Sequence, residues 1–267
     1  MALTDNLEAY YKLEDVTDSH TDDDLTNNGS VSFLSGGIIL NSANFGASNT
    51  TKYLSIADAL GNTGGAYSIA GWVNVTTAPA ADTQTVLFMS EYGTTFVFYS
   101  VQYTDAGGTK KLQFFRGRRG VADEGPEYTV TLTANTWYHI AVTYDGTNVR
   151  GYVDGTLQAG PTAASGDGSS GGTGSAIARF ATANIRYHSG LCDEVGFWTR
   201  AITAAEVSEL YNAGSGLTYP FTTGTQFQIN VGDVWKEVPA IKINIGDAWK
   251  DVASAQINIG DAWKSVF

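Results

Sequence analysis

The chain has 267 residues, a formal net charge of −12 at pH 7 and a single cysteine. This length suits one large domain with an appendage, and the acidic balance excludes general attraction to nucleic acid or anionic membranes. One cysteine, Cys192, excludes an intrachain disulfide and is expected to be a small buried hydrophobe. No apolar run approaches the ~18 residues needed to span a bilayer, and the N-terminus shows no signal-peptide pattern.

Short runs of Thr, Val, Ile and Tyr between clusters of Gly, Asn and Asp predict many strands and few helices. Most runs alternate apolar and polar residues, as half-buried strands do, and they predict strands at 8–13, 67–75, 85–90, 95–103, 111–115, 128–132, 137–144, 149–153 and 192–199. The Asp-Gly pairs at 145–146 and 154–155 predict hairpin turns. The Gly- and Ser-rich stretch 160–175 is expected to be a mobile surface loop.

Basic residues interrupt the acidic chain in one short segment. They are Lys110, Lys111, Arg116, Arg118 and Arg119, and they are interleaved with Phe114 and Phe115. Guanidinium groups suit carboxylate, sulfate or phosphate, and aromatic rings stack on sugar faces. One interpretation is a strand that binds an acidic glycan through Phe115, Arg116 and Arg118, together with Tyr187. The other is a solvated hairpin end whose charges offset nearby carboxylates.

One helix is expected near residue 204. Thr203 and Glu206 have the spacing of a capping box, in which each side chain bonds the backbone N–H of the other residue. Val207, Leu210 and Tyr211 then form an apolar stripe, and Gly214 is the expected stop.

The C-terminal part repeats every 14 residues, in copies at 228–236, 242–250 and 256–264 that each carry one tryptophan: Trp235, Trp249 and Trp263. Each Gly-Asp pair fits a two-residue hairpin turn. That register puts Ile257 and Ile259 on one face and Asn258 and Trp263 on the other. A module this short cannot bury its own apolar residues, so we expect it to contact a partner subunit, a larger assembly or the preceding domain.

Four stretches, at 7–15, 67–73, 135–155 and 191–214, occur in the order of a known family. They resemble the concanavalin A-like lectin/glucanase superfamily, and most closely its laminin-G-like members. The resemblance implies an all-β, two-sheet antiparallel jelly roll with one short C-terminal helix over residues 1–221. Residues 222–267 then form a separate module of three tandem hairpins. Members of this superfamily usually bind carbohydrate or protein, often with a structural calcium.

The resemblance also implies where calcium would bind. The family often pairs an aspartate of an early loop with the aspartate of the late closing strand, here Asp18 and Asp193. Clustered loop carboxylates supply the oxygen ligands that calcium prefers, and Asp23 belongs to the same loop as Asp18. We therefore predict a calcium site of Asp18, Asp23 and Asp193. The alternative is a solvated acidic loop.

Catalytic residues are not expected. Glucanases of the superfamily use an E-x-D-x-x-E strand, and no glutamate here has an aspartate two positions later. His139 lies within a predicted strand and is interpreted as structural rather than as a general base. The sequence thus predicts a protein that is not an enzyme.

The Ile-Asn-Ile-Gly-Asp-x-Trp-Lys repeats are similar to tail pieces of bacteriophage virion proteins. Together, the two resemblances predict a capsid decoration or tail/fibre protein on the virion surface. Its lectin-like domain would bind a cell-surface or environmental glycan, and its repeats would bind other virion proteins or self-assemble, for example as a trimer. Three alternatives stay open: a structural decoration protein without glycan binding, a bacterial surface carbohydrate-binding protein, and sugar binding by the tryptophans themselves.

Overall fold

The computed structural model describes residues 1–60, 65–92, 97–118, 121–164, 172–181 and 185–221, and, in the C-terminal part, the strands of the repeats. The chain divides into two compact units, Met1–Pro220 and Phe221–Phe267. Within the described ranges, no helix is both long and apolar enough to cross a membrane.

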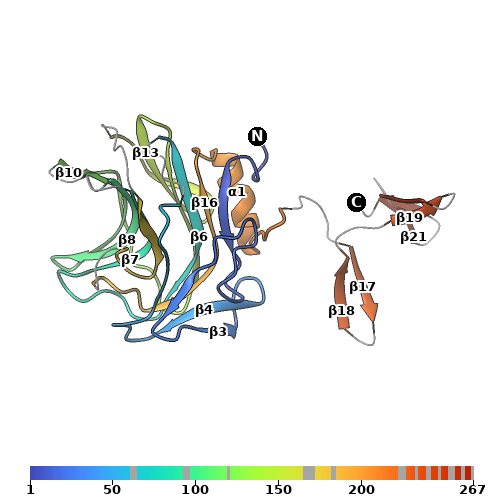
Figure 1. Cartoon of the computed structure of the whole chain (residues 1–267), viewed down its shortest axis with the longest axis horizontal. Helices are drawn as coiled ribbons and strands as arrows, with labels where there is room; N and C mark the ends of the chain where they lie inside the picture. The colour runs from blue at the N-terminus through green and yellow to red at the C-terminus, as the bar shows by residue number, and fades with distance from the viewer. Residues whose placement is uncertain are drawn as a thin grey trace. The chain divides into compact units, whose positions relative to one another are not determined.

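The first unit consists of two antiparallel sheets. Sheet A contains, from edge to edge, β14 (Thr156–Ala163), β13 (Asn148–Val153), β12 (Trp137–Tyr144), β6 (Tyr67–Val75), β16 (Gly190–Trp198), β4 (Asn41–Gly46) and β3 (Ser32–Ser35), and β1 (Leu7–Tyr11) pairs with β16. Sheet B contains β10 (Val121–Glu124), β9 (Thr109–Arg118), β8 (Val97–Ala106), β7 (Gln84–Tyr92), β15 (Gly172–Ile177), β5 (Tyr53–Ile56) and β2 (Thr26–Asn28), and β11 (Glu127–Thr129) pairs with β9. The two sheets lie face to face, and helix α1 (Ala204–Tyr211) lies on the far side of sheet A (Figure 1). The expected all-β jelly-roll sandwich is confirmed.

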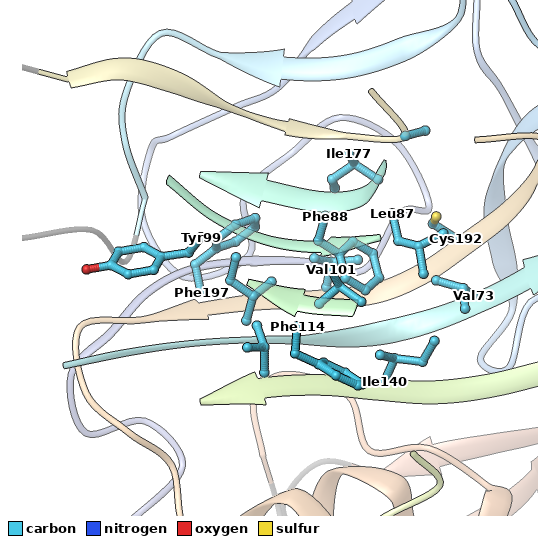
Figure 2. Packing of buried hydrophobic residues seen from close by; sticks show 14 of the residues in the cluster. Val73, Leu87, Phe88, Tyr99, Val101, Phe114, Ile140, Ile177, Cys192 and Phe197 are labelled. Carbon is cyan, nitrogen blue, oxygen red and sulfur yellow. The ribbon is translucent and has the colours of Figure 1, made fainter. Parts of the chain in front are cut away.

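The core lies between the sheets because alternate residues of each strand point inward. Buried side chains from both sheets, among them Val73, Phe88, Phe114 and Ile140, gather in this interior (Figure 2). Cys192 belongs to the same cluster and is fully buried, as expected. The predicted strands at 67–75 and 137–144 match β6 and β12 residue for residue.

The local predictions around the helix are confirmed at its start and corrected at its end. Glu206 N donates to Thr203 Oγ1 at 3.2 Å, and Thr203 N donates to Glu206 Oε2 at 2.7 Å, which completes the capping box. The helix ends at Tyr211 rather than near Gly214. Asn212 takes the left-handed conformation at φ 47°, which asparagine tolerates, and stops the helix there.

The turn predictions are confirmed, and the loop prediction is partly wrong. Asp154 and Gly155 both have positive φ and join Val153 to its partner Thr156, as a two-residue hairpin requires. The stretch 160–175 is not all loop, because β14 runs to residue 163 and β15 begins at residue 172. Residues 165–171 lie outside the described part of the chain.

The second unit contains three two-stranded hairpins. They are β17 (Phe227–Val231) with β18 (Val234–Val238), β19 (Lys242–Ile245) with β20 (Ala248–Asp251), and β21 (Gln256–Ile259) with β22 (Ala262–Ser265). Ile259 pairs with Ala262 and Asn258 with Trp263, so the register is the one predicted for a two-residue Gly-Asp turn. The same asparagine–tryptophan pairing occurs at Trp235 and Trp249. Their side chains lie outside the described part.

Candidate functional site

The face of sheet B that points away from the core presents aromatic, basic and polar side chains. On β9, Leu112 and Phe114 point into the core, so Lys111, Gln113 and Phe115 point outward. Residues paired across an antiparallel ladder share a face. The outward set, here called the outer face of sheet B, includes Lys111, Gln113, Phe115, Phe98, Ser100, Gln102, Val86, Met89, Glu91, Tyr53 and Ser55.

A segment that follows β15 folds back along β7. Ala178 N donates to Leu87 O at 2.9 Å, and Val86 N donates to Arg186 O at 2.8 Å. Phe180 N donates to Ile185 O at 3.3 Å, which joins the two arms of the segment. These bonds place the side chains of residues 179–181 and 185–187 next to the outer face of sheet B.

Aromatic rings and guanidinium groups meet on this segment. The Phe180 ring lies edge-on to Phe98, with centroids 5.9 Å apart, and Arg186 Cζ lies 5.2 Å from the centre of the Phe180 ring. Farther along the sheet, Arg179 Cζ lies 3.6 Å from the centre of the Tyr53 ring. Tyr187 lies beside the same ring, at a centroid distance of 6.2 Å. Tyr53 and Tyr187 are both half-buried residues.

A chain of polar side chains crosses the strands beneath this segment. With its amide oriented to pair acceptors with donors, Gln84 accepts from Arg186 Nε at 2.8 Å and donates to Gln102 Oε1 at 3.1 Å. Gln102 Nε2 in turn donates to Ser100 Oγ at 3.0 Å. Gln102 and Ser100 are fully buried, so these bonds fix the position of the Arg186 side chain.

The four residues predicted to bind glycan have different surroundings. Phe115 and Tyr187 are half-buried and belong to the outer face and its covering segment, with β8, β7 and β15 between them. Arg116 is only 2% exposed, and its Cζ lies 4.9 Å from the centre of the Tyr144 ring in the core. The backbone of Arg118 belongs to β9, whereas its side chain and all of Arg119 lie outside the described residues. In this structure, therefore, Arg116 is not placed to contact a ligand.

The two lysines of the basic segment pair with neighbouring carboxylates. Lys110 Nζ lies 2.7 Å from Asp105 Oδ2, and Lys111 Nζ lies 2.7 Å from Glu127 Oε2. Burial of Arg116 could have been inferred from the alternation of β9, since it follows Leu112 and Phe114 at two-residue intervals. Tyr53 and Arg179 have no local sequence pattern that marks them as site residues, because only the fold brings them to Tyr187.

The predicted calcium ligands act as hydrogen-bond acceptors. Asp18 is buried, and its Oδ1 accepts from the N–H groups of Tyr10 and His20 at 2.8 and 3.0 Å. Its Oδ2 accepts from Thr21 N at 2.9 Å and from the Thr21 hydroxyl. Asp23 Oδ2 accepts from the same hydroxyl at 3.2 Å.

Asp193 lies on β16 and serves a different loop. Its Oδ2 accepts from Ile38 N and Ile39 N at 2.7 and 3.1 Å. In the residues that the structure describes, no three His, Cys, Asp or Glu side chains form a group that could hold a metal ion. Asp18, Asp23 and Asp193 thus do not form one cation site in this arrangement, and calcium binding stays a prediction.

Asp193 and its neighbour Glu194 are carboxyls buried side by side. Burial, and next the neighbouring Glu194, raise the pKa of Asp193 to about 8. Burial also raises the pKa of Glu194 to about 8, although the hydroxyls of Tyr10 and Thr218 favour its charged form. At neutral pH both groups are therefore largely protonated in the folded protein.

Stability should fall as pH rises from about 6.5 to about 8.5. An unfolded carboxyl has a pKa near 4, so the unfolded state has already lost the protons that Asp193 and Glu194 keep in the fold. Stability from these groups is complete below pH ~4 and is lost as pH rises through about 8, at roughly 1.4 kcal/mol per pH unit and group. Thermal melts between pH 6.5 and 8.5 should show Tm decreasing, and Glu194→Gln should reduce the slope.

The buried histidines also make stability depend on pH, but at lower pH than the carboxyls. Burial lowers the pKa of His139 to about 3 and of His188 to about 4, so their stability contribution is lost as pH falls below about 6.5. Above about pH 7.5 both histidines are neutral in the folded and unfolded states, and the carboxyls dominate the pH dependence. Equal slopes for the parent protein and Glu194→Gln would show that Glu194 does not retain its proton. His139 itself packs against Trp72, with centroids 5.2 Å apart, which supports its structural interpretation.

Comparison with known proteins defines the family. A laminin-G-type family model described as concanavalin A-like lectin/glucanases superfamily matches residues 48–208, more than half of the chain. The chain belongs to the concanavalin A-like lectin/glucanases superfamily. The matched residues include most strands of both sheets and most of the helix. The resemblance found in the sequence is confirmed at this level. No curated protein sequence matches the chain.

Solved structures share the fold at low sequence identity. Domain 4 of AbnA, an extracellular arabinanase of Geobacillus stearothermophilus solved in complex with arabinotriose, is 19% identical, with 76% of this chain and 97% of that chain covered and a TM-score of 0.55. The binding domain of Paraclostridial Mosquitocidal Protein 1 is 13% identical, covers 99% and 74%, and has a TM-score of 0.55. A structure of botulinum neurotoxin type C, described as dependent on two ganglioside molecules for cell entry, is 9% identical, covers 98% and 72%, and has a TM-score of 0.59. At these identities the likeness of this superfamily member to them is one of fold.

Proposed function

We propose that the jelly roll is a non-enzymatic domain that binds carbohydrate on the outer face of sheet B. The observation that carries the proposal is the half-buried tyrosine pair, Tyr53 and Tyr187, next to the guanidinium of Arg179. Aromatic rings stack on the apolar faces of sugars. Arg179 is itself buried and donates to Ala181 O at 2.6 Å, so it supports the Tyr53 ring from behind. The half-buried Arg186 is the guanidinium that can donate to hydroxyl or carboxylate oxygens. The neighbouring segment adds Phe180 and Arg186 to the same face.

The ligands named for two of the similar structures support carbohydrate binding. The arabinanase domain was solved with arabinotriose, and the neurotoxin depends on two ganglioside molecules. One ligand is a neutral pentose oligosaccharide and the other carries an acidic headgroup. These two chemistries are therefore suitable first probes for this chain.

The test is the effect of removing one tyrosine ring. Tyr187→Ala and Tyr53→Ala should each weaken binding of the preferred glycan by about tenfold, since an aromatic contact contributes on the order of 1 kcal/mol beyond buried area. Binding would be measured by calorimetry with arabinotriose and with a ganglioside headgroup oligosaccharide, after a glycan array has identified the preferred class.

Tyr219→Ala is the matched control. Tyr219 is also a half-buried tyrosine, but it contacts Tyr10 and His20 near sheet A, with its hydroxyl 3.2 Å from His20 Nδ1. Unchanged affinity in the control beside a tenfold loss in Tyr187→Ala supports the outer face as the site. Equal losses in both variants, or none in either, would remove it.

We further propose that the protein is a bacteriophage virion component, on the virion surface, whose C-terminal hairpins attach or assemble it. Each hairpin has only two strands, and such a hairpin is marginal by itself in water. Trp235, Trp249 and Trp263 occupy the same register position in the three hairpins, as expected of a repeated contact.

Light scattering of the full chain and of a chain ending at Phe221 tests this part. We expect the full chain to be a defined oligomer and the shorter chain to be a folded species of lower mass. If the full and shortened proteins contain the same number of chains per particle, the repeats do not drive self-assembly. A jelly roll that binds no glycan in either form would favour a structural decoration protein, and a bacterial surface protein would be favoured if the repeats prove inert.

We also propose calcium as a structural cofactor of the jelly roll. Asp18 and Asp193 would have to exchange hydrogen bonds with backbone N–H groups for contacts with the ion. Melting in the presence of calcium and of EDTA decides the question: a higher Tm with calcium supports binding, and coincident melts remove it.

A further inference from the structure

The two strands at one edge of sheet A contain no charged residue. No Asp, Glu, Lys, Arg or His occurs between Asp24 and Lys52, although the chain as a whole carries a net charge of −12. Strands β3 and β4 both lie within this uncharged stretch. Two copies of so acidic a chain repel each other over most of their surfaces, and the side chains of β3 and β4 add no charge to that repulsion.

Strand β3 is also an open edge. It pairs with β4 from Ser32–Asn44 to Ser35–Asn41 and is the last strand of sheet A. Among the described strands, none pairs with its other side. Proteins usually protect such an edge with a charge or a proline, and the sequence Ser32-Phe33-Leu34-Ser35 has neither. Figure 1 shows β3 and β4 at the margin of the jelly roll.

Large apolar side chains are exposed at this edge. Leu34 is 50% exposed, and Leu40, in the turn between β3 and β4, is 76% exposed. Leu40 has a φ of 58°, a left-handed conformation that a bulky residue adopts only at an energetic cost. In a monomer no apolar contact compensates for this conformational cost, because the Leu40 side chain is exposed to water.

The turn is held firmly in this conformation. Asp193 Oδ2 accepts from Ile38 N and Ile39 N, and Glu14 accepts from Asn41 N at 3.0 and 3.2 Å. Gly36 N and Gly37 N each donate to Leu40 O at 3.2 Å. A turn fixed by five such bonds or more loses little conformational entropy when a partner covers it.

We propose that the β3 edge, with Leu34 and Leu40, is the surface on which a second copy of this chain docks. Two β3 strands would pair antiparallel about a two-fold axis, so that sheet A continues from one copy into the other. The partner is a second copy because antiparallel pairing of two β3 strands about a two-fold axis is isologous and brings no charged strand residues of the two acidic chains together. This inference rests neither on glycan binding nor on the repeats.

The test uses the full chain and two matched positions. Leu40→Cys and Leu157→Cys each place a thiol at an exposed leucine of sheet A. Leu157 is 42% exposed and lies on β14, the opposite edge of that sheet. Native Cys192 is buried and stays unreactive. A short bis-maleimide should cross-link Leu40→Cys into dimers at least tenfold faster than Leu157→Cys.

A second variant pair keeps the test independent of cross-linking. Leu34→Lys places like charges across the two-fold axis. It should abolish the Leu40→Cys cross-link and halve the mass in solution, because the dimer dissociates. Leu157→Lys should do neither. Both leucines are exposed, so the Tm should change little in either lysine variant, which excludes unfolding as the cause.

Two results would overturn the proposal. One is equal cross-linking at Leu40→Cys and Leu157→Cys with a mass that Leu34→Lys leaves unchanged. The other is protection from hydrogen exchange, in a protein of monomeric mass, of the β3 amides that point away from β4. That result would mean that another segment of the same chain covers the edge.

Discussion

Replacing Glu206 with alanine should lower the free energy of unfolding by about 3–5 kcal/mol. Glu206 is buried and receives both arms of the Arg200 guanidinium, Nη1 to Oε2 at 2.9 Å and Nη2 to Oε1 at 2.6 Å. It also closes the capping box by accepting from Thr203 N. The alanine variant loses the cap and leaves a buried guanidinium without its counter-charge.

The loss should extend beyond the helix, because Arg200 also fixes the N-terminal segment. Its Nε donates to Asp5 O at 2.6 Å and its Nη2 donates to Ala2 O at 2.9 Å. Urea denaturation of the parent, Glu206→Ala and Glu209→Ala measures the effect. Glu209 lies on the same helix and is half-exposed, so its removal should cost less than about 1 kcal/mol. Similar midpoints for the two variants would show that the pair contributes no more than a surface charge.

Phe114→Ala should lower the free energy of unfolding by about 3–5 kcal/mol. The side chain is fully buried and points from β9 across the interior toward sheet A (Figure 2). Its ring lies against Gly151 of β13, where an added Cβ would come within 2.2 Å of Phe114 Cδ2. The two sheets therefore meet here through one large and one minimal side chain.

Gly151→Ala tests the same contact from the other sheet. The alanine methyl group would overlap the Phe114 ring, and overpacking of this kind costs about 1–3 kcal/mol. The double variant Phe114→Ala/Gly151→Ala should be more stable than the sum of the single effects predicts, because the added methyl group occupies part of the cavity. Strict additivity in denaturant titrations would contradict direct packing between these two residues.

The sequence predicted the central strands well because their residues have both strand propensity and alternation. Strands β6 and β12 are rich in aromatic and β-branched residues, and both were predicted to the residue. Strands β4 and β15, with sequences Asn-Ser-Ala-Asn-Phe-Gly and Gly-Thr-Gly-Ser-Ala-Ile, were missed. Asparagine, glycine and serine favour turns, so these strands depend on neighbours that already pair with them.

The candidate site was less predictable than the fold. Local composition pointed to Arg116, but strand alternation and the interior position of its neighbours bury that side chain. Tyr187 was identified without its partners, because Tyr53 lies on a strand remote in sequence and meets it only through the sheet order. Residue type thus indicated the chemistry, whereas position on one face required the topology.

The pairing of β1 with β16 has a consequence for how the protein is made. Tyr10 pairs with Gly196, and Trp198 Nε1 donates to Leu3 O at 2.7 Å, so the first strand of sheet A needs residues nearly two hundred positions later. During synthesis the first strand waits with an unpaired edge until β16 emerges. The repeats follow only after that strand and the helix. A chain cut short within the jelly roll therefore lacks the hairpins. If the hairpins mediate assembly, as proposed above, only chains with a complete jelly roll can enter an assembly.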